Sequence, residues 1–237
     1  MIATGGKSLY GASVGILMLD AQFPRIPGDM GNAATWPFPV HYRIVRGATP
    51  DHVVRHRAEG MLGAFIDAGR SLAEDGADGI STNCGFLSLF QDELDAALDV
   101  PVMTSSLMQV AMVNAVLPQG RRAGVLTISG STLTKEHLTK AGAPPDTPIG
   151  STEDGSEFTR VILGDELHLD VKAARSDNIA AARALQAANP DLGAIVLECT
   201  NMCPYAADIR DAVGLPIFSI YDLLVWFQGG LRPRRHG

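Results

Sequence analysis

Two stretches of the chain, residues 77–84 and 192–199, combine a buried-strand pattern with a cysteine at the end. Pro101 and Pro216 follow the two cysteines at the same distance of seventeen residues. Both intervals carry apolar side chains at helical spacing. Each cysteine is therefore predicted to end a strand and to precede a helix, once in each of two related halves.

The rest of the chain alternates apolar runs, which predict strands, with periodic stretches, which predict helices. The further strands are expected at 14–19, 40–45, 101–105 and 123–128. One or two helices are expected at 51–74, and further helices at 106–117, 129–140, 156–163, 177–188 and 220–228. Residues 143–154 are rich in proline and are expected to form a connection.

This regular alternation predicts an α/β fold of two similar lobes. Each lobe is expected to be a doubly wound, mostly parallel sheet flanked by helices. Pseudo-two-fold symmetry is expected to relate the lobes and to place the active site between them. Lobe one should comprise 1–117 plus 216–237 and carry Cys84, and lobe two should comprise 118–215 and carry Cys199.

The composition excludes several classes of protein. With 237 residues, 46% of them hydrophobic, the chain can bury a sizeable core. A net charge of −7 without a basic stripe disfavours a nucleic-acid partner. Neither a signal-peptide pattern nor an apolar run of the roughly 18 residues that a membrane helix needs is present. We therefore expect a cytoplasmic protein with no membrane or nucleic-acid partner.

In a reducing compartment the cysteines are free for chemistry. A cysteine between a strand end and a helix N-terminus is placed where the helix dipole favours the thiolate. Two such thiols facing one cleft could remove a proton from a carbon and return one on the opposite face. Asn83, Thr200 and Asn201 stand beside the two thiols and are candidates for stabilising the developing charge. Cys203 has no counterpart in the other half and is expected to be structural.

Other segments offer weaker candidates. Residues 20–39 form a long loop after the first strand and are expected to close over the site. Arg25 in this loop is the candidate for binding a second carboxylate. The hydroxyl-rich residues 128–133 suit either a bound carboxylate or an ordinary helix cap. His52 and His56 lack a third ligand, so no metal site is expected.

Three motifs together resemble the cofactor-independent aspartate/glutamate/hydantoin racemase superfamily. They are Asn83-Cys84, Cys199-Thr200-Asn201 and the segment 125–132, and the resemblance covers residues 14–228. The resemblance implies that Cys84 and Cys199 are the acid and base. It also implies that substrate-binding groups come from Asn83, Thr200, Ser129 and Thr132. A small-molecule substrate with a carboxylate or a hydantoin ring, no cofactor and a homodimer are implied as well.

The expected activity is therefore that of a cofactor-independent racemase or epimerase of an amino acid, a related carboxylate or a hydantoin. One alternative is a single-thiol decarboxylase or cis–trans isomerase of the same superfamily. Another is a ligand-binding module without catalysis. Glu198, directly before Cys199, could tune that thiol or bind a substrate amine.

Overall fold

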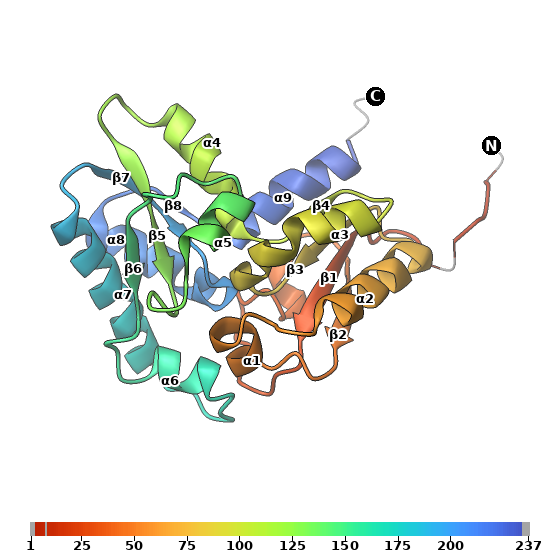
Figure 1. The fold of residues 1–237 in the computed structure, drawn as a ribbon, viewed down its shortest axis with the longest axis horizontal. Coiled ribbons are helices and arrows are strands. Elements are labelled where there is room, and N and C mark those ends of the chain that lie inside the picture. The colour runs from red at the N-terminus through yellow and green to blue at the C-terminus, as the bar shows by residue number, and fades with distance from the viewer. Residues whose placement is uncertain (1–2, 8, 234–237) are drawn as a thin grey trace.

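The computed structural model describes residues 3–7 and 9–233 and contains two parallel sheets of four strands (Figure 1). The first sheet has the order β2-β1-β3-β4. Its strands are β1 (Val14–Leu19), β2 (Val40–Val45), β3 (Gly79–Thr82) and β4 (Val102–Met103). The second sheet has the corresponding order β6-β5-β7-β8. Its strands are β5 (Arg122–Thr127), β6 (Ile149–Ser151), β7 (Leu192–Leu197) and β8 (Ile217–Phe218). The expected α/β fold with two sheets is confirmed.

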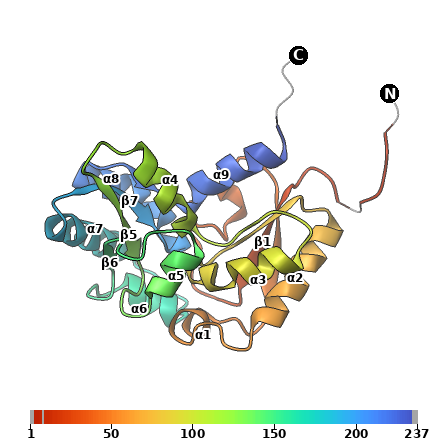
Figure 2. The same ribbon diagram turned by 45° about the horizontal axis from the view of Figure 1, so that its top comes forward.

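Helices cover both sheets, and Figures 1 and 2 show them around the two lobes. The helices that follow strands of the first sheet are α1 (Pro50–Arg55), α2 (Leu62–Asp75), α3 (Gln91–Ala97) and α4 (Gln109–Val116). Those that follow strands of the second sheet are α5 (Lys135–Lys140), α6 (Phe158–Leu163), α7 (Val171–Ala188), α8 (Ala206–Val213) and α9 (Ile220–Leu231). Short 3-10 segments are η1 (Ala33–Thr35), η2 (Gly85–Phe90), η3 (Ser106–Met108) and η4 (Thr200–Tyr205).

Two helices cross between the lobes. Helix α4 follows β4 but packs against β5 and β7, and α9 follows β8 but packs against β3. Gly79 in β3 permits the close approach of α9, since a Cβ there would lie 2.7 Å from Phe227 and from Leu231. Strand β8 pairs with β7. Helix α4 and strand β8 thus lie with the second sheet, whereas the expected boundaries assigned both to lobe one.

Two helix starts and one strand differ most from the sequence-based expectation. Helix α5 begins at Lys135 and not near Ser129, because Thr134 and His137 cap each other there. Helix α7 begins at Val171, where Asp170 accepts hydrogen bonds from two helix amides. The proline-rich connection contains the edge strand β6, which is only three residues long.

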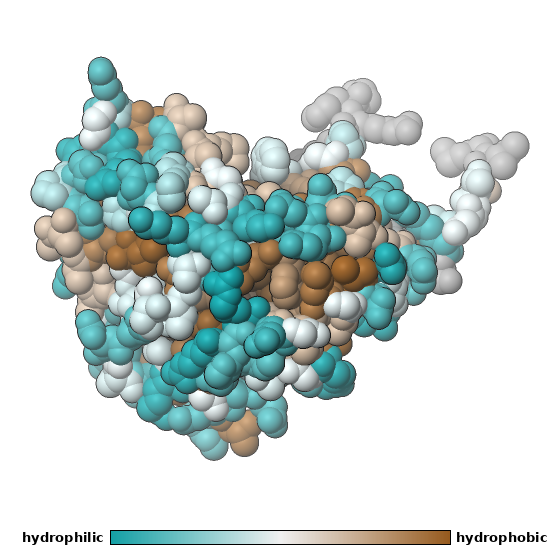
Figure 3. Space-filling model, in the orientation of Figure 1, coloured by the Kyte–Doolittle hydropathy of each residue, from teal (hydrophilic) through white to brown (hydrophobic). Residues whose placement is uncertain are grey.

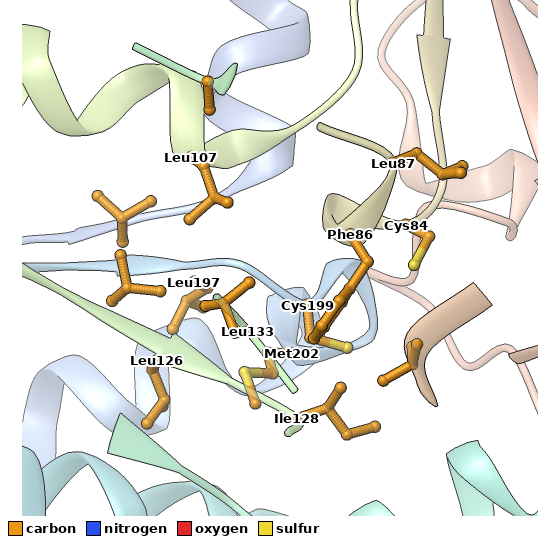
Figure 4. Packing of buried hydrophobic residues seen from close by; sticks show 14 of the residues in the cluster. Cys84, Phe86, Leu87, Leu107, Leu126, Ile128, Leu133, Leu197, Cys199 and Met202 are labelled. Atoms are coloured by element: carbon orange, nitrogen blue, oxygen red, sulfur yellow. The ribbon is translucent and has the colours of Figure 1, made fainter. Parts of the chain in front are cut away.

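The buried core is continuous through both lobes. The larger of two clusters of buried apolar side chains extends from the first sheet, through both cysteine segments, to the second sheet (Figure 4). The smaller cluster joins β1 and β4 to α9. On the outer surface, brown apolar atoms gather over α4 in Figure 3, where Met112 and Val116 are exposed. Within the described part of the chain, no helix is long and apolar enough to cross a membrane.

Candidate active site

The two repeated cysteines occupy equivalent positions in the two lobes. Cys84 comes two residues after β3 and caps η2, and Cys199 comes two residues after β7 and caps η4. Both side chains are buried, with exposed fractions of 8% and 6%. Figure 4 shows them on facing segments, with Phe86 reaching from the first segment toward Cys199. The prediction that each cysteine ends a strand and precedes a helix is confirmed, although a 3-10 turn comes before α3 and α8.

Both cysteines line one enclosed cavity between the lobes. Its wall consists of Leu19, Phe23, Pro50, Val54, Asn83, Cys84, Gly85 and Phe86 from the first lobe, and of Ile128, Ile162, Leu163, Glu198, Cys199, Thr200 and Asn201 from the second. The cavity has a volume of about 20 Å³, which is room for about one water molecule. A substrate therefore enters only when the wall moves.

The wall includes Phe23 from the long loop after β1, so part of this loop lies against the cavity, as expected of a loop that closes over the site. The backbone amides of Gln22 and Phe23 donate hydrogen bonds to Oδ1 of Asp165, at 2.6 and 3.1 Å. Asp165 follows α6 in the other lobe and has a left-handed backbone with φ of 52°. A non-glycine residue rarely adopts this conformation. Asp165 thus holds the loop of the first lobe against the second lobe.

Burial determines the protonation of both thiols. It raises the pKa of the Cys84 thiol, and the Glu198 carboxylate raises it further. Backbone amides of Phe86 and Leu87 act in the opposite direction without compensating. Burial and then Glu198 also raise the pKa of Cys199. The expectation that the helix N-terminus would favour the thiolate is therefore wrong in its net effect, since desolvation of the anion outweighs the dipole.

Glu198 is the only ionisable side chain in the described cavity wall besides the thiols. It is fully buried, and its Oε2 accepts a hydrogen bond of 2.6 Å from Thr127. Oε1 has no hydrogen-bond partner. A side chain at Gly85 would overlap this oxygen, so Oε1 lies against the residue that follows Cys84. Burial raises the pKa of Glu198 to about 7, against the lowering effect of Thr127.

Three expected substrate-binding residues lie in the cavity wall and join the two lobes. Thr200 donates a hydrogen bond of 2.6 Å to the backbone oxygen of Asn83. The Asn83 side chain accepts one from the Leu19 amide at 2.7 Å, which fixes the end of β1. Asn201 accepts one from the Cys199 thiol at 3.5 Å and donates one to Asp29 at 2.5 Å. Their side chains are thus held in place by contacts within the protein.

The hydroxyl-rich loop after β5 binds an anion, but that anion belongs to the protein. Ser129 donates a hydrogen bond of 2.7 Å to Glu153, and Thr132 donates one of 2.8 Å to Ser129. Ser131 binds Glu153 with its amide and its hydroxyl. Burial raises the pKa of Glu153, but these hydrogen bonds together lower it to about 2. Ser129 and Thr132 are not part of the cavity wall.

Arg25 also lies outside the cavity wall. It forms an ion pair of 3.0 Å with Asp29, and its guanidinium lies 4.5 Å from the centre of the Phe23 ring. Asp29 in turn accepts the hydrogen bond from Asn201. The structure therefore uses Arg25 to hold the loop against the site.

Five residues in or around the site were not among the candidates predicted from the sequence, namely Phe23, Phe86, Asp29, Glu153 and Asp165. Each of them acts through contacts with distant parts of the chain, so no local spacing indicates its role. His52 and His56 lie on the outside at the end of α1, with ring centres 6.1 Å apart. In residues 3–7 and 9–233, no group of three or more His, Cys, Asp or Glu side chains is placed to hold a metal.

The model of a family described as Asp/Glu/hydantoin racemase matches residues 66–227. The chain belongs to this family. It is also 30% identical, over 222 residues, to a dimethylsulfoniopropionate lyase of Durusdinium sp. clade D, covering 90% of this chain and 72% of that protein. Four similar lyases of Emiliania huxleyi (strain CCMP1516) are longer, and the matches span 44% to 63% of their length.

Two solved structures share the fold of this chain. Arylmalonate decarboxylase matches with a TM-score of 0.58 and 16% identity, covering 93% of this chain and 95% of that one. Picrophilus torridus aspartate racemase matches with a TM-score of 0.55 and 13% identity, covering 95% and 96%. At such low identity these likenesses concern the fold alone.

Proposed function

We propose that this protein is a carbon–sulfur lyase that cleaves dimethylsulfoniopropionate or a close analogue. The observation that carries the proposal is the set of side chains that line the cavity. Two thiols and one carboxylate line it, and no Arg, Lys or His does so among the described residues. Such a site suits a substrate with a cationic group and a weakly acidic C–H bond. The similarity to named dimethylsulfoniopropionate lyases supports the same substrate.

The reaction needs one base. A cysteine thiolate removes a proton from the carbon next to the substrate carboxylate. The electron pair of that C–H bond forms a C=C bond, and the C–S bond breaks with its electrons moving to sulfur. Neutral dimethyl sulfide leaves, acrylate remains, and the proton stays on the thiol until it passes to solvent.

The closed cavity supports this chemistry in two ways. Its apolar wall, including Phe23, Phe86 and Ile162, excludes the water that would solvate the charges. The amides at the starts of η2 and η4 interact with the thiols and favour their anionic form. A cationic substrate adds to this effect, because it offsets the cost of a buried thiolate.

The expected racemase remains a second candidate because two thiols, one from each lobe, line the same cavity. Racemisation uses the same first step and then returns a proton from the other thiol. The expected substrates for this reaction are amino acids, related carboxylates and hydantoins.

The test is incubation of the purified protein with dimethylsulfoniopropionate and, separately, with chiral amino acids and hydantoins, all in deuterated water. Dimethyl sulfide is measured by gas chromatography and α-deuterium by NMR. Release of dimethyl sulfide that depends on at least one of the two cysteines supports the lyase. Deuterium uptake with inversion of a chiral acid, and no dimethyl sulfide, would establish the racemase in its place.

A further inference from the structure

The carboxylate of Glu198 is unusual among the charged groups of this protein. Its side chain is completely buried, and one of its oxygens has no hydrogen-bond partner. Burial of a carboxylate costs free energy unless a donor or a cation compensates it. Thr127 supplies a single hydrogen bond to the other oxygen. The Oε1 atom of Glu198 is therefore left to bind a group of a substrate that enters the cavity.

Among the described residues that line the cavity, none is a cation that could pair with Glu198. The groups that face it are the thiols of Cys84 and Cys199, and Asp29 lies beyond Cys199. Arg25 acts on Cys84 from outside the cavity and is already paired with Asp29. A substrate that contacts Glu198 thus contacts a carboxylate whose negative charge has no counter-ion in the cavity wall.

The position of Glu198 lets it reach a substrate that touches either thiol. It precedes Cys199 in the chain, and its Oε1 lies against Gly85, which follows Cys84. Gly85 is suited to this contact because it has no side chain. The free oxygen therefore lies between the two cysteine segments, where a substrate held between the thiols would pass.

We propose that Glu198 selects substrates that carry a positive charge beside the reacting carbon, and that it does so by pairing with that charge inside the cavity. The inference deepens the proposed lyase and rests on it for the substrate class, a carboxylate with a sulfonium or ammonium group. A dicarboxylate is excluded by the same charge, because it would bring a second anion toward Glu198.

The test compares two ligands of the same shape and different charge. One is propionate with a trimethylammonium group at its far carbon, and the other carries a tert-butyl group in its place. Neither has a good leaving group, so calorimetry measures binding alone. Above the pKa of Glu198, which is about 7, the wild type should bind the cationic ligand at least about tenfold more tightly. Below that pH the preference should fall, although neither ligand changes its charge there.

Three variants separate a charge effect from a structural one. Glu198→Gln should abolish the preference at every pH. Thr127→Val removes the hydrogen bond that lowers the pKa of Glu198, so the preference should appear only at a higher pH. Glu59→Gln, which changes an exposed carboxylate outside the cavity, should behave like the wild type.

The outcomes distinguish this inference from the proposed function. A cation preference that persists in Glu198→Gln, or no binding of either ligand by the wild type, overturns the role of Glu198 even if dimethyl sulfide is formed. A preference that is lost in Glu198→Gln, in a protein that releases no dimethyl sulfide, supports the role and rejects the lyase.

Discussion

At the scale of single residues, each thiol can act as a base only when another group stabilises its thiolate. Burial raises the pKa of both Cys84 and Cys199, and Glu198 adds to the effect in each case. The thiol is thus the resting form at neutral pH. A bound cation would stabilise a thiolate within the same cavity, so substrate charge and base strength are coupled.

The first prediction concerns the two thiols. We expect Cys84→Ser and Cys199→Ser to reduce the release of dimethyl sulfide by unequal factors, and the variant that lacks the base to lose about a hundredfold or more. An elimination needs one base, so the other variant should keep measurable activity. Initial rates from gas chromatography provide the comparison, with Cys203→Ser as the control outside the cavity. Equal and complete loss in both cavity variants would contradict the single-base elimination and mean that the lyase requires both thiols.

The second prediction uses the raised pKa of Glu198, from 4.5 to about 7. The folded protein then binds a proton more tightly than the unfolded chain does. The resulting stability is fully present below pH 4.5 and is lost as the pH rises through about 7. The loss should be on the order of 3 kcal/mol.

This contribution is measured as the difference in free energy of unfolding between the wild type and Glu198→Gln, by urea titration across this pH range. The difference should change in favour of the variant as the pH rises. A difference that does not depend on pH would mean that Glu198 is already ionised when buried.

Residue types and spacing were sufficient to predict the paired cysteines, because the repeat places both at strand ends. They were insufficient for the hydroxyl-rich loop, where Ser129 binds the carboxylate of Glu153 and Thr132 binds the Ser129 hydroxyl, so the bound anion is part of the protein. The hydroxyl groups in the sequence predict a loop that binds an anion, but they do not identify that anion. The pKa of the thiols was misjudged for a related reason, since the depth of burial depends on the packing of both lobes.

At the scale of elements, the long loop after β1 meets the segment after α6 beside the cavity. The loop contributes Phe23 to the wall, and Asp165 holds the loop through two amides. A cavity of about 20 Å³ has to widen for any substrate. These hydrogen bonds are therefore expected to break and form again in each catalytic cycle.

The third prediction tests this contact. Asp165→Gly removes the side chain that accepts the two loop hydrogen bonds. Glycine suits the left-handed backbone at this position, so the loop should lose these bonds without added strain. We expect kcat/KM for dimethylsulfoniopropionate to fall about tenfold as closure weakens. Asp165→Asn keeps a side-chain oxygen and serves as the matched control, with a smaller loss. If both variants retain the parent kcat/KM, Asp165 does not control closure.

Elements differed in how well the sequence predicted them. β1 was predicted to the residue, and β5 and β7 to within a residue or two, because apolar runs in a parallel sheet are buried on both faces. β2 was also predicted to the residue, but from the alternation of an edge strand that is only partly buried. β6 was missed because it is a short edge strand in a segment rich in proline. The start of α5 was misplaced because the hydroxyls after β5 bind Glu153, while Thr134 caps the helix.

At the scale of the whole molecule, the exchange of α4 and α9 couples the lobes around the site. Each helix follows a strand of one sheet and packs against the other. Direct contacts between α1 and α6 and between α5 and η2 add to this connection between the lobes. The positions of the thiols therefore depend on both sheets. The expected homodimer stays a prediction.

The last prediction is that activity needs neither a metal nor a cofactor. The proton transfers are assigned to Cys84 and Cys199, and the substrate charge is assigned to Glu198. A Lewis acid would have to displace that substrate charge from the same carboxylate, since Glu198 is the only carboxylate in the described cavity wall. Exhaustive dialysis against a chelator should leave dimethyl sulfide release unchanged. A loss of activity that a divalent metal restores would contradict this, and would require a metal site that uses Glu198 or one of the thiols.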